Sequence, residues 1–91
     1  MRNRAIVTVL GKDRVGIVAG VSRVLAENNV NIEDISQTIM QDFFTMIMLV
    51  TLDEDQTSMA GLQEKLNAIG EELGLKITVQ HEDIFRYMHR I

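Results

Sequence analysis

The segment GKDRVGIV, residues 11–18, places two glycines and three charged residues between two apolar runs. A strand that enters a helix here exposes backbone N–H groups at the helix start, and such groups bind anions, including carboxylates. Asp13 is placed to meet an ammonium group, or to cap the helix through its carboxylate. The segment therefore has the chemistry to recognise a free amino acid. The purely structural alternative is a strand stop at Gly11, a cap at Asp13 and a close helix–sheet contact at Gly16.

Other residue types that perform catalysis or bind metals are sparse and poorly spaced. The chain has no cysteine, and neither of its two histidines, His81 and His89, stands in a spacing typical of a nucleophile or metal site. His81 continues the inward row of the last predicted strand, as a half-buried packing residue does. The acidic residues 53–55 could bind a hard cation, but a solvated loop before a helix is the commoner reading. We therefore expect no catalytic residue, no metal and no cofactor.

Four segments have the composition of strands. Residues 4–10 and 43–52 are apolar on both faces and rich in β-branched side chains, which predicts two central strands. Residues 31–41 carry many polar side chains, which predicts an edge strand. Residues 75–82 alternate between apolar and polar side chains, as a half-buried strand does.

Two further segments show helical periodicity. The first carries Ile17, Val21, Val24 and Leu25 on one face and ends at Asn28 and Asn29. The second begins after Thr57 or Ser58, either of which is a suitable N-cap, and ends at Gly74, a suitable left-handed C-cap. Its apolar positions step by three and four, at Met59, Leu62, Leu66, Ile69 and Leu73.

The order βαββαβ predicts an α+β fold, a ferredoxin-like sandwich with a four-stranded antiparallel sheet and two helices on one face. The 91 residues suffice for a single domain, with its core at about 4–82 and a tail helix at about 83–91. The helices cover only one face of the central strands. The tail either docks as a short helix or crosses the other face and shapes a dimer, and we expect the second.

The overall charge excludes several classes of partner. The net charge is −4 and the pI is about 5.0, so the chain repels nucleic acid and anionic lipid. An RNA-recognition module of this topology needs exposed aromatic residues with basic neighbours, whereas Phe43 and Phe44 point to opposite faces. The absence of cysteines and of a long apolar stretch predicts a cytoplasmic protein that does not enter a membrane.

Residues 11–38, GKDRVGIVAGVSRVLAENNVNIEDISQT, resemble the signature region of the ACT domain. In that family a corner of the form Gly-x-Asp-x-x-Gly, followed by Ile or Leu, precedes a helix, and an Asn-Ile pair opens the second strand. The resemblance covers nearly the whole chain. It is strongest to the small stand-alone ACT proteins of the UPF0237 type, which are related to glycine-cleavage repressor regulators and to the ACT segment of formyltetrahydrofolate deformylases.

This resemblance implies a non-enzymatic regulatory module that senses a small molecule, usually an amino acid, where two ACT domains pair in a homodimer. Carried over to this sequence, one domain contributes the corner and its neighbour contributes the start of the second strand: Asp13, Arg14, Val15 and Gly16 from the first, Asn31 and Ile32 from the second. Most ACT domains are attached to an enzyme or DNA-binding partner. Here we expect regulation of a separate protein in trans, or none.

Two alternatives remain open at this point. One is a protein–protein interaction module without a ligand, in which the corner is only structural and Asn31 serves a left-handed turn, as asparagine often does. The other is an acylphosphatase-like hydrolase, which would require Arg14 for turnover.

Overall fold

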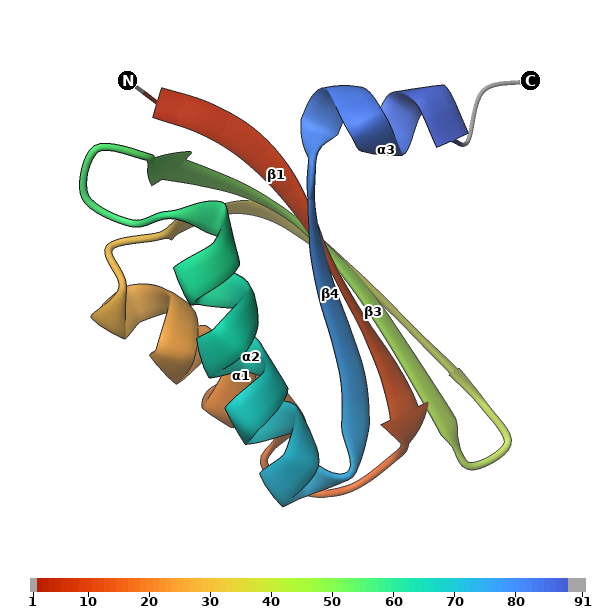
Figure 1. The fold of residues 1–91 in the computed structure, drawn as a ribbon. Coiled ribbons are helices and arrows are strands. Elements are labelled where there is room, and N and C mark those ends of the chain that lie inside the picture. The colour runs from red at the N-terminus through yellow and green to blue at the C-terminus, as the bar shows by residue number, and fades with distance from the viewer. Residues whose placement is uncertain (1, 89–91) are drawn as a thin grey trace.

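The computed structural model describes residues 2–88. Its elements follow the predicted order βαββαβ and add a short C-terminal helix (Figure 1). In chain order they are β1 (Arg2–Lys12), α1 (Ile17–Glu27), β2 (Asn31–Met40), β3 (Phe43–Asp53), α2 (Met59–Leu73), β4 (Leu75–His81) and α3 (Glu82–Met88). Residues 89–91 of the predicted tail lie outside the described part of the chain.

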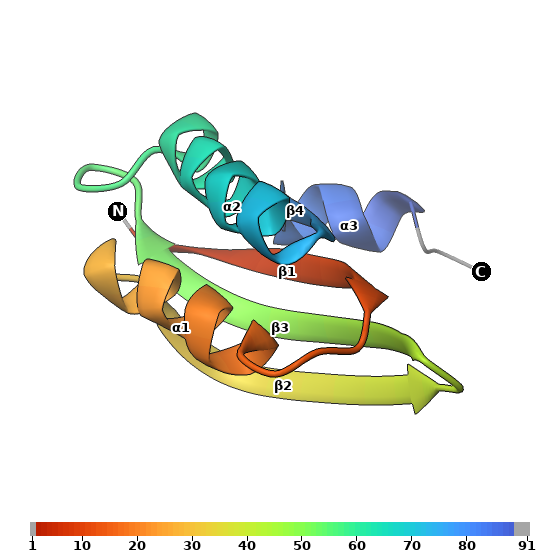
Figure 2. The same ribbon diagram turned by 90° about the horizontal axis from the view of Figure 1, so that it is seen from below.

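The four strands form one antiparallel sheet in the order β2-β3-β1-β4. Helices α1 and α2 both lie on one face of this sheet (Figure 2). Strands β1 and β3 pair over the whole length of β1, from Arg2 opposite Asp53 to Lys12 opposite Phe43. The two segments that are apolar on both faces are therefore the central strands, which confirms the predicted ferredoxin-like α+β fold.

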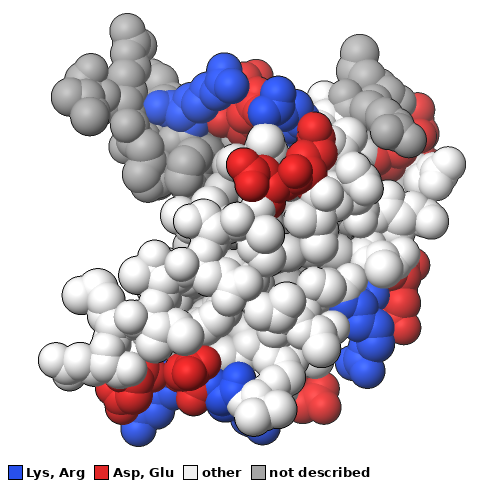
Figure 3. All heavy atoms as spheres, turned by 180° about the vertical axis from the view of Figure 1, so that it is seen from behind, with Lys and Arg blue, Asp and Glu red and all other residues white. Residues whose placement is uncertain are grey.

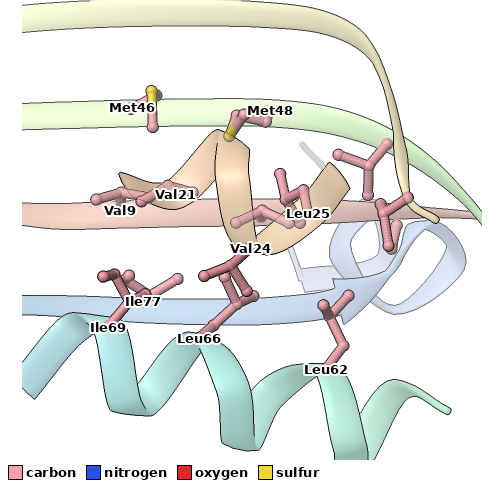
Figure 4. Close-up of a cluster of buried hydrophobic side chains, with 14 of the residues drawn as sticks. Val9, Val21, Val24, Leu25, Met46, Met48, Leu62, Leu66, Ile69 and Ile77 are labelled. Carbon is pink, nitrogen blue, oxygen red and sulfur yellow. The ribbon is translucent and has the colours of Figure 1, made fainter. Parts of the chain in front are cut away.

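The hydrophobic core fills the space between the sheet and the two helices (Figure 4). Alternate residues of β1 and β3 point into it, among them Val9, Met46 and Met48, which are fully buried. The apolar stripes of both helices face these strands, with Val21 from α1 and Leu66 from α2 also fully buried. The predicted helical faces are thus the ones that pack against the sheet.

The ends of the two long helices follow local chemistry. Ser58 is the N-cap of α2, and its Oγ accepts a hydrogen bond from the N–H of Gly61 at 3.0 Å. Gly74 ends α2 in the left-handed region with φ 71°. After α1, the left-handed residue is Asn29, with φ 59°, and Asn31 already belongs to β2. A left-handed turn therefore does not explain the asparagine at position 31.

The two edge strands differ in what lies along them. Along β4, the side-chain amide of Gln63 from α2 donates to the Ile77 carbonyl at 2.8 Å and accepts from the Val79 N–H at 2.9 Å. This amide takes the hydrogen bonds that a neighbouring strand would make. Along β2, every residue except the half-buried Ile32 is exposed. Within residues 2–88, β2 is therefore the edge that is open to another chain.

The described part of the tail, helix α3, does not cross the open sheet face, contrary to the sequence prediction. Helix α3 begins directly after β4 and lies against one end of β1 and β4, where Arg4 Nε is 2.8 Å from Glu82 Oε2. Its seven residues span about 10 Å, too short a distance to reach back across the sheet. Leu10 and Ile47, on the two central strands of that face, remain 45% and 40% exposed.

Candidate functional site: the β1–α1 corner and the start of β2

The corner between β1 and α1 presents backbone donors to solvent. Gly16 is the N-cap of α1 with φ 95°, and its carbonyl accepts from the N–H of Gly20 at 2.8 Å. Among the described residues, no side chain caps this helix end. The first N–H groups of α1 therefore lack helical partners and carry the positive end of the helix dipole. A carboxylate is the group that this arrangement would hold.

The predicted role of Asp13 as a helix cap is wrong. The cap position falls three residues later, at Gly16, and the Asp13 side chain is exposed. The backbone of Asp13 has a structural role, because its N–H donates to the Asp42 carbonyl at 2.8 Å and so ties the corner to the β2–β3 turn.

The predicted reason for glycine at position 16 is also wrong. A Cβ built on Gly16 meets nothing within 4 Å, so no close helix–sheet contact requires glycine there. The positive φ requires it instead. The close contact belongs to Gly11, where a Cβ would lie 2.6 Å from Leu75 Cδ2 and 3.1 Å from the Gly74 carbonyl.

Basic side chains surround the corner in an otherwise acidic chain. Lys12 and Arg14 are exposed on either side of Asp13, and the Arg14 guanidinium donates to the Leu73 carbonyl at the end of α2, at 3.4 Å. Val15, by contrast, is 95% exposed and contributes an apolar surface. The corner thus combines backbone donors, two cations and one carboxylate, which suits a ligand that carries both a carboxylate and an ammonium group.

The start of β2 lies at the other end of α1, beside a polar depression of about 410 Å³. Asn31 lines this depression, while Ile32 is half-buried and packs against the core. The remaining lining residues come from the α1–β2 connection, the end of β3 and the following loop: Asn29, Val30, Thr51, Leu52, Asp53 and Gln56. Sequence reasoning missed Thr51 and Gln56, because Thr51 is brought beside Asn31 by strand pairing and Gln56 lines the depression from the turn that follows β3.

A buried polar network fixes the connection that leads into β2. The Asn28 side chain donates to the Val24 carbonyl at 2.7 Å and accepts from Lys65 Nζ at 2.6 Å. The Asn28 carbonyl accepts from Thr57 Oγ1 at 2.7 Å. Asn28 is only 8% exposed, so these bonds satisfy a polar group that would be costly to bury alone. They hold the start of β2 against α2 and the loop before it.

One chain does not bring the two groups of predicted ligand residues together. Residues 13–16 precede α1 and Asn31 follows it, and the eleven residues of the helix span about 16 Å. Within residues 2–88 there is also no cluster of three His, Asp or Glu side chains arranged for a metal ion. None of the described helices is long and apolar enough to cross a bilayer.

A model of the ACT domain family matches residues 3–80. The chain belongs to the ACT domain family. It is 60% identical over 88 residues to a UPF0237 protein from Methanopyrus kandleri, an alignment that covers 97% of this chain and 98% of that protein. The family and the relative together confirm the resemblance seen in the sequence.

Solved structures agree with this assignment. An ACT domain protein from Streptococcus pneumoniae superimposes with a TM-score of 0.79 and 43% identity, covering 91% of this chain and 93% of that one. The regulatory subunit of aspartate kinase from Thermus thermophilus superimposes with a TM-score of 0.67 and 25% identity, covering 86% and 50%. ACT domains are generally regulatory ligand-binding modules, so the family indicates a regulatory rather than a catalytic domain.

Proposed function

We propose that this protein is a regulatory module that binds an amino acid or a related metabolite between two copies of the chain. The ligand carboxylate occupies the β1–α1 corner of one copy, residues 13–16, and Asn31 and Ile32 of the other copy complete the site. The observation that carries this proposal is the position of the two half-sites at opposite ends of α1. Two copies related by a two-fold axis bring them together.

The position of the corner along β2 supports this arrangement. The hydrogen bond from the Asp13 N–H to the Asp42 carbonyl holds the corner beside the turn that follows Met40, at the end of β2. Asn31 is the first residue of the same strand. If β2 pairs antiparallel with its own copy, the first residue of one strand lies near the last residue of the other. Asn31 of the partner subunit then lies beside this corner.

The open edge of β2 supports the same pairing. Gln63 already occupies two hydrogen-bonding groups in the middle of β4, so β2 is the edge that better accepts a second sheet. Figure 3 shows that an uncharged surface crosses this side of the molecule, while most Lys, Arg, Asp and Glu side chains gather toward its upper and lower borders. Ile35 and Ile39 on β2 are 39% and 54% exposed and would be buried by such a contact.

The mechanism that follows is linkage. A ligand that contacts both copies binds the dimer more tightly than the single chain, so it stabilises the dimer. A regulated protein that recognises only the dimer then responds to the ligand in trans. The chain acts as a sensor, and the chemistry belongs to its partner.

Thermal unfolding against the twenty amino acids and common folate-pathway metabolites tests ligand binding. At 100 times its Kd, a ligand adds about 2.7 kcal/mol of stability, which raises the Tm of a domain of this size by roughly 10 °C or more. Asn31→Ala should abolish the rise, and Asn67→Ala, an exposed asparagine on α2, should retain it. A dimer that responds to no compound would instead favour a protein-interaction module.

Subunit mixing tests whether the site spans two chains. Asp13→Ala and Asn31→Ala should each lose ligand binding. In a mixed dimer of the two variants, one site carries both substitutions and the other carries neither. Mixing should therefore restore binding to one site in each mixed dimer, measured by isothermal titration calorimetry. If mixing restores nothing although the subunits exchange, the two half-sites do not act across the dimer.

A further inference from the structure

The sheet face that α1 and α2 leave open has an uncharged centre. Thr8 and Ile47 pair across β1 and β3 in the middle of this face. Leu10 is the next residue of β1 whose side chain points to the same face. Ile47 and Leu10 are 40% and 45% exposed. In a chain with 24% charged residues, a central region without charge has the composition of an interface core.

This face is also hollowed rather than flat. A depression of about 120 Å³ lies where β1, β2 and β3 meet, lined by Ile6, Asp34, Ile35, Ser36, Ile47 and Leu49. The hollow lies next to a bulge in β2, of which Glu33 is the extra residue. The Glu33 carboxylate accepts a hydrogen bond from the Thr51 hydroxyl. A hollow of this size accepts one aliphatic side chain of a second surface.

The strand register places charges of opposite sign at opposite corners of the face. Asp34 pairs with Leu49, which pairs with Ile6, which pairs with Gln80, so these four residues form one row across the sheet. The row that holds Lys76 continues through Leu10 and Thr45 to Thr38. The four corners are therefore Asp34, Gln80, Lys76 and Thr38, with Asp34 diagonally opposite Lys76.

The dimensions of this face make it self-complementary. Three strand spacings separate β2 from β4, about 14 Å, and four residues separate the two rows, also about 14 Å. The corners thus form a near-square. A two-fold axis along the diagonal from Thr38 to Gln80 places Asp34 of each copy on Lys76 of the other. Residues that lie on the axis contact the same residues of the other copy. A charged residue there would face a like charge, whereas the residues along this diagonal are uncharged.

We propose that this open sheet face binds a second copy of the chain, with the two sheets packed face to face. A rotation of 180° about this diagonal turns the strands of one sheet across those of the other, which corresponds to orthogonal sheet packing. The apolar centres around Ile47 come together, and two ion pairs between Asp34 and Lys76 close the rim. This contact uses the open face of the sheet rather than the backbone edge of β2, although both include side chains of β2, and it does not depend on ligand binding.

Sedimentation equilibrium of the full chain tests the contact. Ile47→Glu places two carboxylates against each other near the axis, so it should halve the mass of the wild-type assembly. Glu71→Lys, a charge change on the exposed side of α2, should leave the mass unchanged. A wild-type protein that is monomeric at high concentration, or an Ile47→Glu variant of unchanged mass, would overturn the proposal.

A charge exchange tests the identity of the occupant. Asp34→Lys alone and Lys76→Asp alone each replace two attractive pairs with two like-charge pairs, so each should weaken self-association at least about tenfold. The double variant recreates both pairs with their signs reversed and should recover most of the loss. Asp34→Asn keeps the oxygen that accepts from the Ile35 N–H and serves as the uncharged control.

Recovery in the double variant identifies the second copy as the occupant, because no other partner carries the matching exchange. Weakening in both single variants without recovery in the double variant would show that a different contact holds the copies together, and would overturn the proposal. The Ile47→Glu protein should still show the amino acid response expected of the β2-edge site. Loss of that response alone would count against the proposed function and not against the face contact.

Discussion

Substitution of Gly16 should separate two reasons for a glycine at the corner. Gly16 has φ 95°, a region that side chains with a Cβ rarely adopt, and nothing lies within 4 Å of the position that a Cβ would take. The backbone conformation alone should therefore set the cost. For Gly16→Ala this cost is about 1–2 kcal/mol, the penalty of a left-handed conformation for an ordinary residue.

The relative stabilities of three Gly16 variants distinguish backbone strain from crowding. Asparagine tolerates the left-handed region better than alanine, so Gly16→Asn should be less destabilising than Gly16→Ala despite its larger side chain. The β-branched side chain of Gly16→Val should be the most costly. If crowding were the cause, the cost would rise with side-chain size, and asparagine would be worse than alanine.

Urea unfolding monitored by circular dichroism measures these differences. For a domain of this size, 1 kcal/mol corresponds to about 4–8 °C in Tm, so the variants should be separable by melting as well. Gly11→Ala and Gly11→Asn supply the contrast, since a Cβ there would lie 2.6 Å from Leu75 Cδ2. If Gly16→Asn proves more destabilising than Gly16→Ala, the assignment of the glycine to its φ is refuted.

Two other substitutions test contacts along β4. Gln63→Leu removes both hydrogen bonds to the strand edge and should lower the free energy of unfolding by about 1–3 kcal/mol. It should also speed amide exchange at Val79. Unchanged exchange there would contradict the proposed covering of the β4 edge by Gln63. Gly70→Ala should destabilise the protein although alanine favours helices, because its Cβ would lie 2.8 Å from the Leu75 carbonyl. An increase in the free energy of unfolding of Gly70→Ala would show that α2 moves freely away from β4.

The sequence was sufficient for the arrangement of strands and helices. Two strands that are apolar on both faces are expected at the centre of the sheet, and the short β2–β3 connection makes β2 and β3 neighbours. These two features together give the observed order β2-β3-β1-β4. Ser58 and Gly74 were identifiable as helix ends because capping is local chemistry. These features depend on residues close together in the chain.

The features that sequence reasoning missed depend on three-dimensional context. The sequence alone does not show why a glycine is needed at a position. Gly16 is needed for its positive φ, whereas Gly11 is needed because Leu75 packs closely against its backbone. Gln63 resembles any polar residue on an exposed helix position, and only the placement of α2 beside β4 shows its hydrogen bonds to the strand. The tail was assigned to the open face because apolar surface needed a cover, but α3 packs against one end of β1 and β4 and is too short to cross the sheet.

The proposed two-chain site has a quantitative consequence for signalling. Each dimer has two sites, and each contributes about 2.7 kcal/mol at a ligand concentration 100 times its Kd. Together they supply about 5.4 kcal/mol, close to the amount that moves a population from 1:99 to 99:1. Ligand should therefore convert a weak β2-edge dimer into the dominant species without any change inside the domain, and Asn31→Ala should abolish this conversion in sedimentation velocity experiments. A protein partner that reads the paired β2 edges needs no contact with the ligand, which explains how a domain with so small a site could regulate a separate protein.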